Sequence, residues 1–151
     1  MSKYLGLSTF SLKTSQIKNC NELGSLIGLK SLTLENNKSF SDISGLSTLK
    51  NLTTLVLDGN NITNLSPLLG TINESGKIGY TSSLNLSNNP SLDGYTFGDN
   101  IAVLLKLHAA GLKKVTLTGC SFSGNEIQEL INGKTIDGVT YAGFGSGNVI
   151  N

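Results

Sequence analysis

Apolar residues recur along the chain in the pattern LxxLxLxxN, where x is mostly polar. The two clearest copies occupy residues 29–37 and 52–60. Weaker copies align with them, so the central apolar position falls at 10, 32, 55, 84 and 115, and faintly at 139. In an extended strand alternate side chains share a face, so the two apolar residues of LxL point into one core while their neighbours point outwards. The pattern therefore predicts one short strand per repeat.

A single coil of this kind leaves its leucines half exposed, so neighbouring coils must stack to bury them. The small polar residue that ends each copy lies at the turn, where its side chain can hydrogen-bond to main-chain groups of adjacent coils. These structural ladder positions are Ser15, Asn37, Asn60, Asn89 and Cys120.

In this register the chain resembles a leucine-rich repeat protein over essentially its whole length. The short early steps, from 10 to 32 to 55, resemble those of bacterial surface proteins of the internalin type. The resemblance implies an α/β fold, a right-handed solenoid with one parallel strand per repeat on the concave face and an irregular convex side. We expect one domain over residues 1–151, with 143–151 as a flexible tail or linker.

Two helices are predicted in the C-terminal half, on the convex side. Between residues 98 and 111 apolar side chains repeat with helical spacing, and Asp99 or Asn100 is placed to cap the start. The second helix is signalled by Ser123 and Glu126, which form a capping-box pair ahead of another apolar stripe.

Other segments are expected to lie in surface loops. The insertion Gly70–Thr81 is rich in Gly, Ser, Thr and Asn and shows no apolar periodicity, so we predict a loop without structure of its own. This loop and the segment with Tyr95 and Phe97 are further candidate recognition surfaces, because loops on rigid scaffolds often carry binding residues.

Composition limits the function classes. Only 14% of the residues are charged, the net charge is +1, and none of the basic residues is arginine, so the chain lacks the basic footprint of a nucleic-acid binder. The longest apolar run, Ile101 to Leu105, is too short to cross a bilayer, and the N-terminus has no export-signal pattern. We expect neither nucleic-acid binding nor membrane insertion.

The residue inventory does not favour an enzyme or a metal site. The single histidine, His108, lies on the apolar stripe of a predicted helix, so no base stands beside a Ser or Cys nucleophile. Residues 58–61 lack the remaining ligands of a calcium loop. We expect a structural role for His108, no metal, no cofactor and no catalysis. Cys20 and Cys120 belong to the first and fifth coils, too far apart for a disulfide, so both should be free thiols.

The outward residues of the strands form the predicted concave face, and the binding candidates lie there. They are Lys13, Thr33, Glu35, Val56, Asp58, Asn85, Ser87, Thr116 and Thr118. This set contains none of the Trp, Tyr and Arg residues that dominate interface energies. Lys13, Glu35 and Asp58 fall in successive coils, which brings two like charges together. The triplet is either a polar contact point, a weak cation site, or a solvated face on which Lys13 compensates Glu35.

Two functions are compatible with these patterns. The first is a non-catalytic binding module that recognises a protein or a surface polymer, a monomer within a larger bacterial chain that is extracellular or on the cell surface. The second is a structural spacer in a multidomain protein, favoured by the plain concave face. The chain begins directly before the first coil, as an excised segment or the tail of something larger would. We therefore expect apolar edge residues such as Tyr4 and Leu5 to be exposed there.

Overall fold

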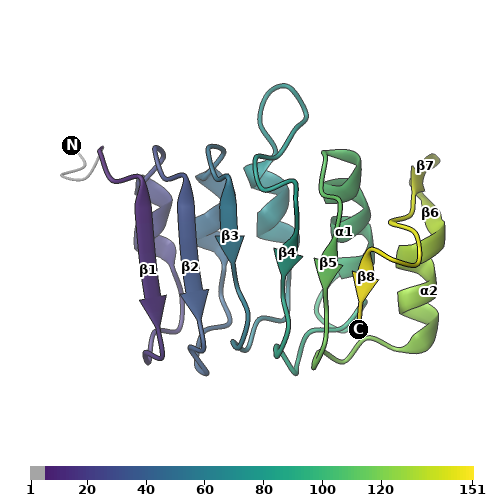
Figure 1. Cartoon of the computed structure of the whole chain (residues 1–151), viewed down its shortest axis with the longest axis horizontal. Coiled ribbons are helices and arrows are strands. Elements are labelled where there is room, and N and C mark those ends of the chain that lie inside the picture. The colour runs from purple at the N-terminus through teal and green to yellow at the C-terminus, as the bar shows by residue number, and fades with distance from the viewer. Residues whose placement is uncertain (1–5) are drawn as a thin grey trace.

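The computed structural model describes residues 6–151 and has the predicted architecture, a solenoid built around one parallel sheet (Figure 1). Six strands lie side by side in chain order. They are β1 (Thr9–Lys13), β2 (Ser31–Glu35), β3 (Thr54–Val56), β4 (Leu84–Asn85), β5 (Val115–Thr116) and β8 (Val149–Ile150). The α/β solenoid predicted from the repeat is confirmed.

The register of the sheet follows the leucine pattern. Phe10 pairs with Leu32, and Leu32 pairs with Leu55 in the next coil. Further along, Leu84 pairs with Val115. These five residues were the predicted strand centres, and four of them are buried while Phe10, in the terminal coil, is partly exposed. Parallel stacking thus brings one apolar residue of every coil to the same level of the core.

The sixth coil differs from the prediction. Val139 lies in β7 (Val139–Ala142), which pairs antiparallel with β6 (Gly133–Ile136), and the residue that pairs with Val115 is Val149 in β8. The cause is the Asp137–Gly138 turn, where both residues have positive φ and close a two-residue hairpin. A hairpin folds the segment back on itself, so Val139 cannot continue the parallel sheet.

The predicted tail at 143–151 is also corrected, because these residues carry β8 and contribute to the core. Phe144 is 4% exposed and packs against the ring of His108, with the ring centroids 4.3 Å apart. The backbone N–H of Val115 donates to the carbonyl of Asn148, and the N–H of Leu117 donates to that of Ile150. The end of the chain is therefore a rung of the sheet.

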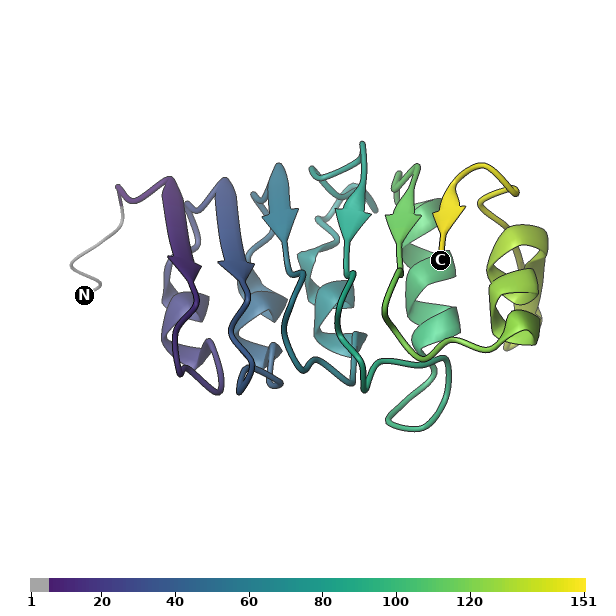
Figure 2. The ribbon, with the colours of Figure 1, turned by 60° about the horizontal axis from the view of Figure 1, so that its bottom comes forward.

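The opposite side of the solenoid carries two kinds of helix (Figure 2). The first half has the short 3₁₀-helices η1 (Asn21–Ser25), η2 (Ser44–Thr48) and η3 (Ser66–Thr71). The second half has α1 (Asn100–Ala109) and α2 (Gly124–Asn132), as predicted. A 3₁₀-helix has three residues per turn, and the buried residues Ile43, Leu46 and Leu49 follow that spacing.

The α-helices begin and end through local hydrogen bonds. The Asp99 side chain accepts from the backbone of Ala102, so Asp99 is the N-cap of α1. At its C-terminus Leu112 N–H donates to the carbonyl of Leu107, a Schellman bond that depends on the positive φ of Gly111. In α2 the predicted capping box is present. Within residues 6–151, neither these nor any other helix has the length and apolarity needed to span a membrane.

The two ends of the solenoid are built differently. At the C-terminal end, α2 and the β6–β7 hairpin lie beside the last coils (Figure 1). At the N-terminal end Leu7, Phe10 and Leu23 are only partly buried and line a cavity of about 320 Å³ that opens outwards. The predicted edge residues Tyr4 and Leu5 lie outside the described residues.

Candidate binding site on the sheet

A ladder of buried asparagines joins neighbouring coils at the turn after each strand. The Asn60 amide nitrogen donates to the carbonyls of Leu34 and Leu57, both at 2.8 Å, and its Oδ1 accepts from Asn37 N–H at 2.9 Å. One coil later the Asn89 amide nitrogen donates to the carbonyls of Leu57 and Leu86, while its Oδ1 accepts from Ile62 N–H. Buried main-chain groups are thus satisfied where the chain bends, which fixes the spacing and level of the strands.

At its two ends the ladder has a serine and a cysteine, which form fewer hydrogen bonds than the asparagines do. It also has one member that the sequence pattern did not identify. Ser15 donates its N–H and hydroxyl to Oδ1 of Asn37, and Cys120 Sγ donates to the carbonyl of Leu86 at 3.1 Å. Asn100, considered above only as a helix cap, is fully buried. Its amide contacts the carbonyls of Thr63 and Asp93 and the N–H of Leu65. It falls outside the repeat register, and this is why it was missed.

The outward side chains of the sheet form what we call the strand face, the predicted concave face. In its N-terminal part Lys13 forms an ion pair with Glu35 at 2.5 Å. This contact agrees with the alternative in which Lys13 compensates the charge of Glu35. Hydrogen bonding to Glu35 raises the pKa of Lys13. Asp58 lies in the next coil, and partial burial, with the Glu35 charge as a smaller cause, raises its pKa.

In the rest of the strand face the binding candidates are neutral, although Lys114 lies on the same face two residues before Thr116. Thr33, Val56 and Asn85 occupy equivalent positions in successive strands, as the register shows, and Thr116 follows next to Asn85. The Asn85 side-chain oxygen accepts from both the N–H and the hydroxyl of Ser87. The remaining candidate, Thr118, is exposed. The candidates therefore lie on one surface, and the acidic side chains of that surface are confined to the first three coils.

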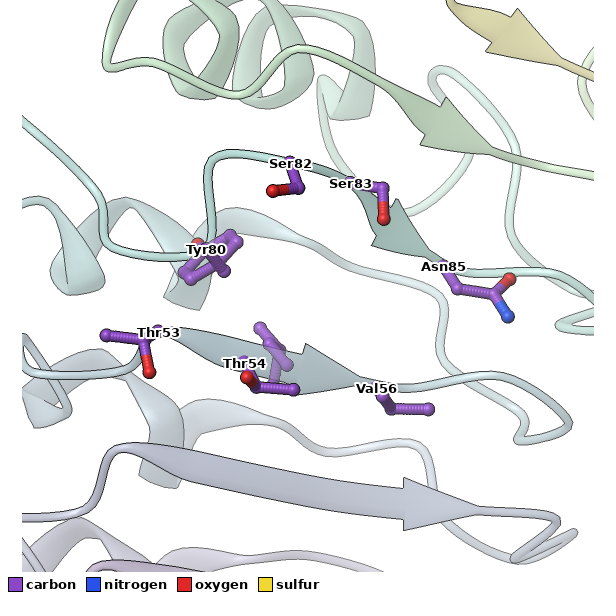
Figure 3. Close-up of a pocket in the computed structure, with 8 residues that line it drawn as sticks. Thr53, Thr54, Val56, Tyr80, Ser82, Ser83 and Asn85 are labelled. Atoms are coloured by element: carbon purple, nitrogen blue, oxygen red, sulfur yellow. The ribbon is translucent and has the colours of Figure 1, made fainter.

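A cavity of about 220 Å³ interrupts the strand face between β3 and β4 (Figure 3). We call it the notch. Its lining is Thr53, Thr54, Leu55, Val56, Tyr80, Ser82, Ser83 and Asn85. Figure 3 shows Thr54 and Val56 on one strand, Ser83 and Asn85 on the other, and Tyr80 between them. Of these eight residues, the sequence pattern had singled out Val56 and Asn85 as binding candidates, and Tyr80 lies in the insertion 70–81 that was named as a further candidate surface.

The notch follows from the insertion before β4. The segment predicted as an unstructured loop begins inside η3 and returns to the core, since Ile78 and Tyr80 are buried. The Tyr80 hydroxyl pairs with the buried Thr71 hydroxyl at 2.7 Å, and burial raises the pKa of Tyr80 to about 12. The extra residues lift the chain away from β3, so these strands pair only at Val56 and Asn85.

A second polar cluster joins the loop before α1 to α2 and β6. Tyr95, exposed as predicted for its loop, donates its hydroxyl to Glu129, and Lys134 donates to both residues. These hydrogen bonds raise the pKa of Lys134 and lower that of Glu129. Phe97 is 53% exposed nearby in sequence. The cluster brings residues from the loop, α2 and β6 together, which sequence spacing could not predict.

The remaining chemical groups are held in the scaffold. His108 is half buried, and its Nδ1 lies 2.6 Å from the carbonyl oxygen of Leu112. Cys20 and Cys120 are free thiols, and burial raises the pKa of Cys20 to about 11. Among residues 6–151 no three His, Cys, Asp or Glu side chains are close enough to hold one metal ion. The hydrogen bond of His108 goes to a backbone carbonyl, not to a hydroxyl or thiol.

Comparison with known proteins supports the architecture. No protein-family profile and no curated sequence matches the chain. Among solved structures, an internalin (InlF) from Listeria monocytogenes aligns with a TM-score of 0.62 and 21% sequence identity. The alignment covers 79% of this chain but only 30% of that internalin. The likeness therefore concerns the fold of the repeats.

Proposed function

We propose that this chain, which has the internalin-like leucine-rich repeat fold, is a non-catalytic binding module that contacts a protein partner through its strand face. Its place would be in a larger bacterial protein that is secreted or held at the cell surface. The observation that carries the proposal is the open strand face itself. Six strands present their outward side chains on one side, while every helix lies behind the sheet or at its C-terminal end (Figures 1 and 2).

The strand face is suited to recognition because its geometry is fixed before a partner arrives. The asparagine ladder and the leucine core set the positions of the strands, so outward side chains lose little freedom on binding. Acidic side chains lie only in the N-terminal part of this surface, around Glu35, whereas the charged residue beside Thr116 is the basic Lys114. That difference gives the surface a direction, so a partner can be selected in one orientation.

The second candidate function is a spacer that holds flanking modules apart. One observation favours it: the outward positions Thr33, Val56 and Thr116 carry small side chains, and large anchors are what usually dominate binding energy. The two proposals differ in whether the strand face is sensitive to substitution.

A cell-binding experiment distinguishes the two functions. The fluorescently labelled chain is titrated on human cells and on bacterial cells, with unlabelled chain as competitor. The double variant Thr33→Lys, Thr116→Lys adds bulk and charge to the strand face, and Ser47→Lys places the same change on the exposed surface of η2. We expect saturable binding that the double variant loses and Ser47→Lys retains. No saturable binding, or equal binding by all three proteins, overturns the proposal and leaves the spacer.

A further inference from the structure

The notch is held open by its own packing. Tyr80 is fixed at its base by the hydroxyl bond to Thr71, and the backbone of Ile78 donates to the carbonyl of Ala110 at 3.1 Å. Gly79 lies against the carbonyl of Leu52, where a Cβ would come within 2.2 Å of the oxygen. These contacts fix the entry to β4, so the walls cannot close without breaking the core. Because the cavity is already open in the free protein, binding of a ligand carries no added free-energy cost of opening it.

The walls of the notch carry hydrogen-bonding groups that the protein itself leaves free. Between β4 and β5 the Leu84 N–H donates to the carbonyl of Lys114 at 2.9 Å. The equivalent bond across the notch would join Leu55 N–H to the carbonyl of Ser83. Within the described residues, Leu55 N–H and the Ser83 carbonyl do not form this hydrogen bond.

Side-chain groups add to this set. Within residues 6–151 the hydroxyls of Thr54, Ser82 and Ser83 make no hydrogen bond to the protein. The Asn85 oxygen is occupied by Ser87, which leaves the Asn85 amide nitrogen as a free donor. Donors and acceptors therefore surround the cavity on both strands, where Figure 3 shows the side chains of Thr54, Ser83 and Asn85.

The chemistry of the lining selects a class of ligand. No charged side chain lines the notch, so an ionic ligand would lose hydration without gaining a partner. Leu55, Val56 and the ring of Tyr80 supply an apolar part between the polar groups. The volume, about 220 Å³, is below the ~300 Å³ at which pockets for drug-sized ligands begin. A neutral ring with hydroxyls on its rim and C–H groups on its face matches all three features.

We propose that the notch between β3 and β4 binds one neutral pyranose unit of a saccharide. The sugar hydroxyls would bond to the free groups of Thr54, Ser83 and Asn85, and its C–H face would lie toward the apolar part of the lining. This ligand class goes beyond the proposed protein partner. One ring in a half-open cavity binds weakly, so useful affinity would come from several rings or from several copies of the module on one polymer.

An NMR titration of the whole chain tests the proposal directly. Glucose, galactose, mannose and N-acetylglucosamine are added separately, and amide shifts are followed. We expect saturable shifts at Thr54, Val56, Ser83 and Asn85 for at least one sugar, with a Kd in the millimolar range.

A filled-notch variant with a matched control makes the result specific. Thr54→Tyr places a ring in the notch, whereas Ser31→Tyr makes the same change at the paired position one strand earlier, outside the lining. Circular dichroism and thermal unfolding verify that both variants fold. We expect Thr54→Tyr to weaken sugar binding by about tenfold or more and Ser31→Tyr to leave it unchanged.

Three outcomes overturn the proposal. The first is no saturable shift with any of the four sugars, and the second is sugar binding that survives Thr54→Tyr. In the third, N-acetylglycine N-methylamide gives saturable shifts at the notch while the sugars do not, which would assign the notch to the main chain of a protein. Each of these leaves the cell-binding test of the strand face to be read separately, because Thr33 and Thr116 lie outside the notch lining.

Discussion

The N-terminal and C-terminal halves of the solenoid use the same strand and ladder but close their coils differently. In the first half the centres of the strands are 22 or 23 residues apart, and the return segments η1 and η2 are single 3₁₀ turns. In the second half Leu84 and Val115 are separated by enough chain for α1, a helix of 10 residues. The longer steps leave room for an α-helix, although the similarly long step from Leu55 to Leu84 carries the 3₁₀-helix η3, and there β4 pairs with β3 only at Val56 and Asn85.

The ends of the two halves also differ. An internal coil packs against one coil on each side, so a terminal coil has one side without a packing partner. At the C-terminal end, the hairpin at Asp137–Gly138 precedes the last rung, β8, and Phe144 fills the core. At the N-terminal end of the described chain, Phe10 and Leu23 border an open cavity. The comparison indicates that stacking maintains the interior, whereas the ends need residues outside the repeat.

The largest effect is expected where the ladder joins two coils. Asn60→Ala removes three buried hydrogen bonds, with Leu34, Leu57 and Asn37 as partners, and leaves their main-chain groups unpaired. We expect a loss of about 3 kcal/mol or more in the free energy of unfolding, measured with urea. Ser15→Ala, at the partly exposed end of the ladder, is the control and should cost well under half of that. Equal losses for the two variants would show that the ladder is not stronger inside than at its end.

The next effect distinguishes the 3₁₀ stack from the α-helical half. Gly45 in η2 lies so close to η1 that a Cβ would be 2.1 Å from the carbonyl oxygen of Cys20. Gly45→Ala should therefore destabilise the fold by about 2 kcal/mol through overpacking. Gly124 at the start of α2 has open space around it, so Gly124→Ala should cost nothing measurable. Thermal unfolding of both variants gives the difference, and a tolerated alanine at Gly45 would mean that the 3₁₀ helices can separate without cost.

A smaller effect tests how the C-terminal end is held. The Ser123 hydroxyl caps α2 by accepting from Glu126 N–H, while the Glu126 side chain accepts from Ser123 N–H. Ser123→Ala should lower stability by about 1 kcal/mol and speed hydrogen exchange in α2 more than in η2. Ser146→Ala, an exposed position, is the control. Exchange that rises equally in both helices would indicate that the two halves unfold as one unit.

The sequence predicted the regular parts of the molecule because they depend on local or repeating signals. The first five strand centres follow from apolar spacing alone, whereas the faint sixth one at Val139 was wrong, and α1 and α2 follow from caps such as Asp99 and Ser123. The 3₁₀ helices were missed although Ile43, Leu46 and Leu49 show the three-residue period. That signal is short and was obscured by the stronger leucine pattern.

The irregular parts could not be predicted, because they depend on how an insertion packs. Tyr80 lies in a segment rich in Gly, Ser and Thr, and nothing in its neighbours indicates that its ring enters the core. The notch exists only because that ring and Thr71 hold the chain away from β3. In contrast, the proximity of Lys13, Glu35 and Asp58 follows directly from the register, so the charged part of the strand face could be predicted and the cavity could not.

The smallest effect concerns the acidic side chains, which only the N-terminal half of the strand face carries. Asp58 has its pKa raised by partial burial and, to a smaller extent, by Glu35, whereas its counterparts Ser87 and Thr118 are neutral. Because the folded state holds this proton more tightly than the unfolded state does, stability falls as the pH rises from the ordinary value of 3.8 through the raised pKa. Above that window the ionised carboxylate destabilises the fold by a constant amount.

Asp58→Asn removes that cost, so it should stabilise the chain at pH 7 by less than about 1 kcal/mol, because the side chain is partly solvated. The gain should vanish at pH 3, where both states are protonated. Urea midpoints at the two pH values measure it, and Glu74→Gln, on an exposed loop, should change neither. A loss of stability at pH 7 would mean that Lys13 attracts Asp58 more strongly than Glu35 and burial oppose its charge. The ionised Asp58 would then stabilise the N-terminal part of the strand face. The two halves of the solenoid would differ in stability only through their helices behind the sheet.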